Sequence, residues 1–402
     1  MTQRTRQEAV ALGVAAVLLG TAAAGCAGQQ DRAADRQESG SPDASAAGGS
    51  GAARAFTLVA SGDVLPHASV IKQAKADARM DVGGDDYDFR PMLAGVKPVV
   101  SRADLAICHM ETVYGENGNY TGYPTFKSPP QVAKALAATG YDACSTASNH
   151  TLDDGAAGVR RTLDALDTAG IKHAGSARSA AEAARPALLR AGGAKVAQLA
   201  YTYGTNGYPL PAGEPWAVNL IDEERIVADA RAARRAGADV VVVSLHWGTE
   251  WQPEPDRRQL RLGRSLTAAA TEGRPDIDLI LGTHAHVPQG YEKVNGTWVV
   301  YGMGDQIAGP MVNHSGAEDP RGNQSSIGRF TFQPPAREGR RWTVTKAEFI
   351  PQWMDTGAGR VVNLPAELRR DPGRAEYRDA QSAIRAVVLS RGAGRQGLTM
   401  GR

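Results

Sequence analysis

Short apolar runs in this chain repeatedly end in side chains that bind metals. The chain has 8 histidines, and His150, His246, His284 and His286 all follow such runs directly, with His67 close behind another. Carboxylate, carboxamide and imidazole ligands without thiolate suit Mn, Fe or Zn, and the set is large enough for two divalent ions. Two ions side by side can hold an oxyanion and lower the pKa of a shared water, so the chemistry indicated is hydrolysis. The five positions are Ser61-Gly62-Asp63, Cys108-His109-Met110-Glu111, Ser148-Asn149-His150, Leu245-His246-Trp247-Gly248 and Gly282-Thr283-His284-Ala285-His286.

An α/β domain with a largely parallel sheet would bring these positions together. From Phe56 onward, strand-like runs alternate with amphipathic stretches, and the carboxyl ends of such strands converge on one crevice. After about residue 290, a turn at Asn295-Gly296 predicts antiparallel pairing and a late hairpin-rich sheet. The predicted strands are 57–60, 105–107, 143–147, 196–200, 240–245 and 279–281, followed by 329–332 and 342–350. The predicted helices are 131–139, 159–169, 223–236, 257–270 and 376–390.

The first 54 residues predict export and tethering. Arg4 and Arg6 precede an apolar run at 9–24 that is shorter than a membrane-spanning helix, which is typical of a signal peptide. The run ends in Ala-Ala-Gly-Cys, which resembles a bacterial lipobox, so residues 1–26 are predicted to be a lipoprotein signal with Cys26 as the acylated residue. Residues 27–54 are small and polar and predict a disordered tether. The expected location is extracytoplasmic, with a lipid anchor in the cell membrane.

Composition narrows the class of partner. A net charge of +2, from 45 basic and 43 acidic residues, excludes the basic excess typical of nucleic-acid binders. The 3 cysteines form no zinc-finger or disulfide-scaffold pattern, and whether Cys108 and Cys144 pair stays open. Residues 55–360 are predicted to form the main domain, and 361–402 a C-terminal helical tail.

Taken in order, the motifs resemble the CapA family, named for capsule and poly-γ-glutamate synthesis, whose fold is similar to that of calcineurin-like metallophosphoesterases. The resemblance runs through about residues 56–310. It implies a layered α/β/β/α sandwich with a two-metal site at the strand ends. The motifs are Gly62-Asp63 with His67, His109-Met110-Glu111, Asn149 to Gly155, His246 to Trp251 with Pro255 and Gln259, Gly282 to Gln289, and Tyr301 to Asp305.

The resemblance also implies roles for single residues. The implied metal ligands are Asp63, Glu111, Asn149, His150, His246, His284 and His286. Leu65 stands where the phosphoesterases carry a histidine, and His67 is a candidate to replace it. Glu111 stands in place of a metal-bridging aspartate, and Asp305-Gln306 in place of the usual Asn-Phe.

The first functional hypothesis is a metal-dependent hydrolase that acts outside the membrane on an anionic or peptide-like polymer of the capsule or cell envelope. The predicted catalytic residues are His246, Glu111 and His286. The candidates for supporting the ligands or contacting substrate are Asp153, Glu250 and Gln289.

Two alternatives remain open. The chain could be a non-catalytic, membrane-tethered subunit that guides an anionic polymer for a synthase complex. The row Arg257, Arg258, Arg261 and Arg264 could then meet carboxylates, although this helical spacing is typical of a solvated face. The other alternative is a generic phosphodiesterase.

Overall fold

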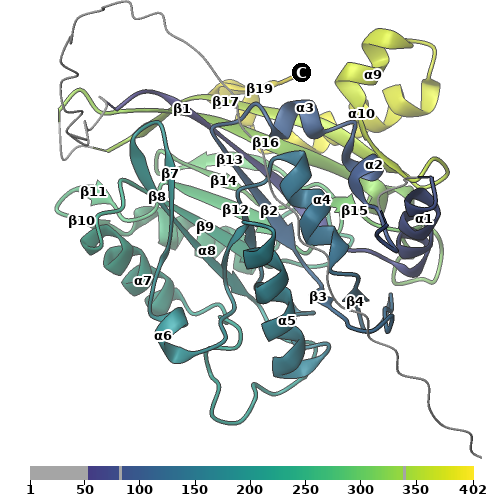
Figure 1. Ribbon diagram of the computed structural model, residues 1–402. Helices are drawn as coiled ribbons and strands as arrows, with labels where there is room; N and C mark the ends of the chain where they lie inside the picture. Colours follow the sequence, from purple (N-terminus) through teal and green to yellow (C-terminus); the bar gives the residue numbers. More distant parts are fainter. Residues whose placement is uncertain (1–52, 81–83, 338–340) are drawn as a thin grey trace, which may run out of the picture. The chain divides into compact units, whose positions relative to one another are not determined.

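The computed structural model describes residues 53–80, 84–337 and 341–402, and within them two β-sheets carry most of the chain (Figure 1). The first sheet has the order β18-β17-β16-β1-β2-β5-β6, with β15 beside β1 and β19 beside β17. The second has the order β13-β14-β12-β9-β8-β7. Strands of the first sheet are β1 (Phe56–Val64), β2 (Leu105–Met110), β5 (Ala143–Ser145), β6 (Lys172–Ala174), β15 (Asp305–Ile307), β16 (Gln324–Gln333), β17 (Thr343–Asp355), β18 (Arg360–Asn363) and β19 (Leu398–Met400). Strands of the second are β7 (Ala187–Ala191), β8 (Ala194–Thr202), β9 (Val240–His246), β12 (Leu279–Thr283), β13 (Tyr291–Val294) and β14 (Thr297–Val300).

Helices cover the outer faces of both sheets. Helices α1 to α5 pack on the first sheet, and α7 and α8 on the second. Two short ribbons, β3 (Val113–Tyr114) with β4 (Lys127–Ser128) and β10 (Ala270–Thr271) with β11 (Arg274–Pro275), lie outside the sheets. The helices are α1 (Ala68–Ala78), α2 (Arg90–Leu93), α3 (Lys97–Val100), α4 (Gln131–Thr139), α5 (Gly155–Thr168), α6 (Ala180–Ala183), α7 (Glu223–Arg235), α8 (Arg257–Ala268), α9 (Leu364–Arg370) and α10 (Ala375–Val388).

Strand β9 shows why this sequence makes four layers. All seven of its residues are buried, because the strand is covered on both faces. Val240 and Val242 join the core between the two sheets, whereas Val241 and Val243 pack against helix residues on the other side. A strand with one exposed face would alternate apolar and polar residues, so this unbroken valine run is the signature of a central strand. The α/β/β/α layering implied by the family resemblance is confirmed.

The predicted strands and helices are confirmed with small shifts at their ends, and β16 and β17 pair antiparallel as expected. One prediction is corrected. Residues 361–402, predicted as a helical tail, contain α9 and α10, but β18 and β19 also pair with β17. The segment therefore completes the first sheet. None of the helices in the described ranges combines the length and the hydrophobicity needed to cross a bilayer. The predicted signal peptide and most of the predicted tether lie outside the described residues.

Candidate metal centre

The first sheet places three ligand-type residues side by side. Asp63 near the end of β1 is in register with His109 on β2 and with Asp305 on β15. The close approach of β15 requires glycine before Asp63, because a Cβ on Gly62 would lie 1.7 Å from the carbonyl oxygen of Gly304. Glu111 directly follows β2, two residues beyond His109, and the strand's period of two points both side chains the same way.

The second sheet supplies three histidines from the ends of β9 and β12. His246 ends β9 and is in register with Thr283 at the end of β12. His284 and His286 follow in a loop with left-handed backbone angles, φ 91° and 55°, which are rare for residues other than glycine. The backbone N–H of His284 donates to Oδ2 of Asp63 at 3.1 Å, so the loop is fastened to the first sheet. Strained backbone of this kind clusters at functional sites, where it aims side chains.

The two sets of side chains meet around Asp63. Oδ1 of Asp63 lies 3.5 Å from Nε2 of His109 and 3.8 Å from Nδ1 of His246. Nε2 of His246 lies 3.6 Å from Oε1 of Glu111. Three groups have all their ligand atoms within 4.8 Å of one another, and they share residues: Asp63, His109 and His246; Asp63, Glu111, His286 and Asp305; and Glu250, His284 and His286.

Many polar atoms of these groups are buried without a hydrogen-bond partner. An unpaired carboxylate oxygen in a protein interior is strongly unfavourable unless a cation or a proton satisfies it. The nitrogen and oxygen donors without thiolate are those that Mn, Fe and Zn accept, so the residues present fit divalent ions. The unpaired atoms are Oδ1 of Asp63, Nε2 of His109, both carboxylate oxygens of Glu111, Nδ1 of His284 and Oδ2 of Asp305.

The pKa values of these residues are shifted because the residues are buried close to one another. Burial, and then the neighbouring carboxylates, raise the pKa of Asp63 and of Glu111 well above their usual range. Burial lowers the pKa of His109 to about 3 and also lowers that of His246. Burial alone would lower the pKa of His286 too, but the surrounding carboxylates outweigh it and raise this pKa. Carboxylates bind metal in their ionised form, so a bound cation would oppose these upward shifts in the pKa values of Asp63 and Glu111.

Hydrogen bonds fix the His246 ring from both sides. Its Nε2 lies 2.8 Å from Oδ1 of Asn149, and its Nδ1 lies 3.0 Å from Oγ1 of Thr283. The Asn149 side chain is itself held, because its Nδ2 donates to Oδ1 of Asn206 at 3.1 Å. The structure thus brings Asn149 to the centre, in contact with a histidine ring.

Two histidines predicted as ligands lie outside the three groups found among the described residues. His150 is held by Asp153, with Nδ1 2.6 Å from Oδ2. Nδ1 of His67 faces the backbone of Leu65 and Gly309. Both rings pack edge-on against Phe126, with centroids 4.8 Å away for His150 and 5.0 Å for His67. The two histidines therefore pack on the same phenylalanine ring and belong to none of the three ligand groups.

The other two predicted supporting or substrate-contacting residues, Glu250 and Gln289, lie in different surroundings. Glu250 is half-buried and belongs to the group with His284 and His286. Gln289 is fully buried, and its amide donates to the backbone of Gln252 and accepts from Gln259. Of the two roles expected for Gln289, supporting a ligand or contacting substrate, this enclosure by the protein itself disfavours the substrate contact.

His109 and Asp305 are the functional residues that sequence reasoning missed. His109 lies in the strand-end motif Cys108-His109-Met110-Glu111, of which only Glu111 is predicted as a ligand, although the spacing of two residues indicates that both side chains face the same way. Asp305 was noted only as a departure from the usual Asn. Tyr203 was also missed; its ring packs 4.4 Å from that of His284, centroid to centroid.

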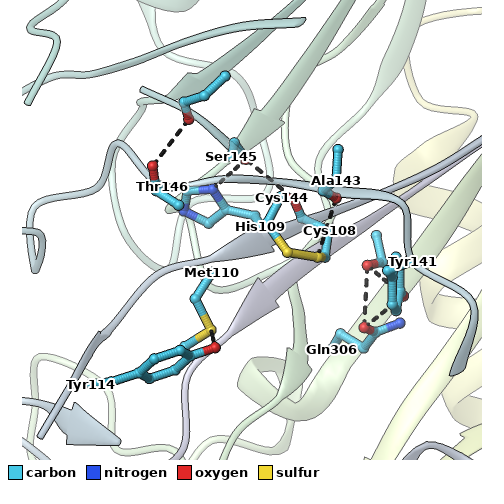
Figure 2. The surroundings of a disulfide bond; sticks show 12 residues. Cys108, His109, Met110, Tyr114, Tyr141, Ala143, Cys144, Ser145, Thr146 and Gln306 are labelled. Carbon is cyan, nitrogen blue, oxygen red and sulfur yellow. Dashed lines mark hydrogen bonds between the residues drawn. A yellow bond between two sulfur atoms is a disulfide. The ribbon is translucent and has the colours of Figure 1, made fainter. Parts of the chain in front are cut away.

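A disulfide lies next to His109, one of the residues of this centre (Figure 2). Cys108 on β2 pairs with Cys144 on β5, and the two residues are in register. The next pair along the strands is His109 and Ser145, with Nδ1 of His109 2.7 Å from Oγ of Ser145. The disulfide therefore joins the two strands that precede Glu111 and Asn149, and the sequence had left this pairing open.

Two facing sheets covered by helices, with carboxylates and imidazoles gathered at the strand ends, define a protein of the metallophosphoesterase-like fold class. Residues 57–310 match the family described as bacterial capsule synthesis protein PGA_cap, and the chain belongs to this family.

Two relatives show how far the similarity extends. The chain is 24% identical over 232 residues to capsule biosynthesis protein CapA of Bacillus anthracis, covering 56% of this chain and 54% of that protein. It is 26% identical over 217 residues to PGA biosynthesis protein CapA of Bacillus subtilis (strain 168), covering 53% and 55%. The matches thus cover only about half the length of these curated relatives. The solved calcineurin-like phosphoesterase YfkN from Bacillus subtilis aligns with a TM-score of 0.40 and 15% identity over 76% of this chain and 92% of that one.

Proposed function

We propose that the protein is a metal-dependent hydrolase that acts on a capsule or cell-envelope polymer, with poly-γ-glutamate as the first substrate to test. The observation that carries the proposal is the buried meeting of unpaired carboxylate and imidazole atoms around Asp63. Divalent ions bound there would supply a Lewis acid and an activated water. The family membership and the names of the relatives direct the choice of polymer.

The chain's own residues have separable tasks in this proposal. Asp63 and Glu111 supply the negative charge that holds the cations, and His109 and His246 flank them. Nδ1 of His286 donates to Oδ1 of Asp305 at 3.0 Å, which fixes its ring. A proton on this imidazole is placed to serve a leaving group, which is the general-acid role.

We propose further that the protein is exported and anchored through Cys26. The Ala-Ala-Gly-Cys sequence after an apolar run motivates the anchor. The disulfide between Cys108 and Cys144 favours an oxidising compartment, because disulfides rarely persist in the bacterial cytosol. A Cys26→Ala variant should lose labelling by a fatty-acid analogue and fail to fractionate with membranes. Unlabelled wild-type protein would contradict the anchor.

The alternative, a non-catalytic polymer-binding subunit, is favoured by one observation. Leu65, at the position where the phosphoesterases have a histidine, is buried with Phe126, Ala308 and Met311 in an apolar cluster. That side of the centre therefore lacks an imidazole at this position.

Turnover separates the two functions. Purified protein should be loaded with Mn, Fe or Zn, its metal content measured, and its hydrolysis of poly-γ-glutamate, peptidoglycan fragments and a simple phosphodiester compared with that of His246→Ala. We expect polymer cleavage that requires metal and is lost in the variant. Metal binding without cleavage of any of the three would favour the binding subunit, and cleavage of the phosphodiester alone would favour a generic phosphodiesterase.

A further inference from the structure

A second, strongly basic cavity lies away from the metal centre. It has a volume of about 840 Å³, and it opens between α2, α3, β18 and α9. We name it the arginine cleft after its six lining arginines: Arg102, Arg329, Arg360, Arg369, Arg370 and Arg402.

Two of these arginines are neutralised by the protein and others are not. Arg329 pairs with Glu348 at 2.8 Å, and Arg360 pairs with Asp77 at 2.9 Å. In the described part of the chain, Arg102 and Arg369 have no ion pair or side-chain hydrogen bond, and Arg370 has only Glu367 at 3.6 Å. The cleft therefore keeps a local positive charge, although the whole chain carries only +2.

We propose that the arginine cleft binds an extended polycarboxylate chain. Guanidinium groups bind carboxylates through two parallel hydrogen bonds, and Arg360 already holds both oxygens of Asp77 in this way. Several unpaired guanidiniums along one open cavity suit a ligand that repeats its carboxylate, because each contact alone is weak and exposed.

The position of the cleft sets a minimum length for a ligand that reaches both the cleft and the metal centre. Arg102 lies just before β2, whereas Glu111 lies just after it, and the six residues of β2 span about 20 Å. A long chain can reach both the cleft and the metal centre, but a single monomer cannot. This step rests on the proposed function, since it takes the substrate to be an anionic polymer; binding in the cleft does not depend on cleavage.

Helix α8 offers a matched comparison. Arg257, Arg261 and Arg264 are exposed on α8, are not among the residues that line the cleft, and recur at helical spacing. Reversing three arginines there changes the net charge as much as reversing three in the cleft. A difference between the two variants therefore reports the site and not the total charge.

The test is equilibrium binding without metal. Full-length protein in EDTA should be titrated with fluorescently labelled long poly-γ-glutamate at low and high salt, with inorganic polyphosphate and neutral dextran in parallel. We expect Arg102→Glu/Arg369→Glu/Arg370→Glu to weaken binding by at least about tenfold, and Arg257→Glu/Arg261→Glu/Arg264→Glu by less than about twofold. Circular dichroism and thermal unfolding check that both variants are folded. The single change Arg369→Gln gives a milder, intermediate loss if the triple variant does not fold.

Other results of the binding experiment would contradict specific parts of the proposal. Equal losses in the two triple variants, or no binding by wild type, would overturn the cleft as a polymer site. Tighter binding of polyphosphate than of polyglutamate would overturn the polycarboxylate assignment. Wild-type protein that binds the polymer but does not cleave it with metal would contradict the hydrolase and leave the cleft intact.

Discussion

Replacing His109 by alanine tests whether the centre is built as the structure indicates. The change removes an Nε2 atom that lies 3.5 Å from Oδ1 of Asp63 and has no hydrogen-bond partner. If this atom is a ligand, its loss lowers the affinity for metal by at least ~10–100-fold, which is the range seen even for groups that only support ligands. A merely structural histidine would leave the affinity unchanged.

The magnitude follows from linkage between binding and folding. A metal at a hundred times its dissociation constant stabilises the folded protein by about 2.7 kcal/mol. A tenfold weaker site at the same metal concentration gives about 1.4 kcal/mol, and a hundredfold weaker site about 0.4 kcal/mol. His109→Ala should therefore lose about half or more of the metal-dependent part of the free energy of unfolding.

Urea unfolding with metal and with EDTA isolates that part. The variant also leaves a void and removes the hydrogen bond between His109 and Ser145, so its stability in EDTA falls too, and only the difference between the two conditions is informative. His173→Ala is the matched control, because His173 lies on β6 in register with Cys144 and is also largely enclosed. Equal metal-dependent stabilisation in wild type and His109→Ala would refute the reasoning, as would an equal loss in His173→Ala.

Other changes test charge, catalysis and packing. In EDTA, the pKa of His109 in the folded protein is about 3, below the value of 6.5 in the unfolded chain. The stability that this neutral histidine contributes is therefore present above pH 6.5 and is lost as the pH falls, by about 1.4 kcal/mol per pH unit. Urea unfolding at pH 7 and pH 5 should show a smaller loss of stability in His109→Gln than in wild type, and an equal loss would contradict this. His246→Ala and Glu111→Gln should each reduce polymer hydrolysis by at least ~10–100-fold, while His67→Ala should have a milder effect in the same assay. Gly62→Ala should destabilise the protein by at least ~1–3 kcal/mol in urea unfolding, because the added Cβ meets a carbonyl oxygen at 1.7 Å; a near-wild-type value would mean that β15 moves away freely.

Much of the fold and part of the centre can be predicted from the sequence. Asp63, Glu111 and His246 each stand at or beside the end of a recognisable apolar run, and the convergence of strand ends then places them together. His109 stands in the same strand-end motif as Glu111, but the family resemblance implies a ligand role only for Glu111, and a histidine beside an apolar run can equally be a buried structural residue. Asp305 depended on the short β15, three residues long, whose pairing with β1 no local pattern announces.

The arginine cleft illustrates a different limit. In sequence, the conspicuous basic feature is the row on α8, because its members are neighbours along the chain. Arg102 lies more than 200 residues before Arg329 and Arg369, although all three line the cleft. They lie close together only because β16, β17 and β18 pair in order beside β1 and β2 in the first sheet. The order in which distant strands pair cannot be read from the local periodicity of a sequence. A surface that depends on that order is therefore found only in the structure.

The surroundings of Asp63 show that a metal site can keep its histidine ligands even where one histidine of the sequence motif is missing. The phosphoesterase histidine is replaced here by Leu65, which is buried in an apolar cluster, and His67 turns to the backbone instead of joining the ligand groups. On the neighbouring strand, however, His109 brings an imidazole to the same carboxylate, and the register of β1 with β2 fixes that placement. A ligand set is a property of positions in space, so a histidine lost from one strand can be supplied by another. If that substitution operates, metal affinity depends on His109 and not on His67, which the paired alanine variants distinguish.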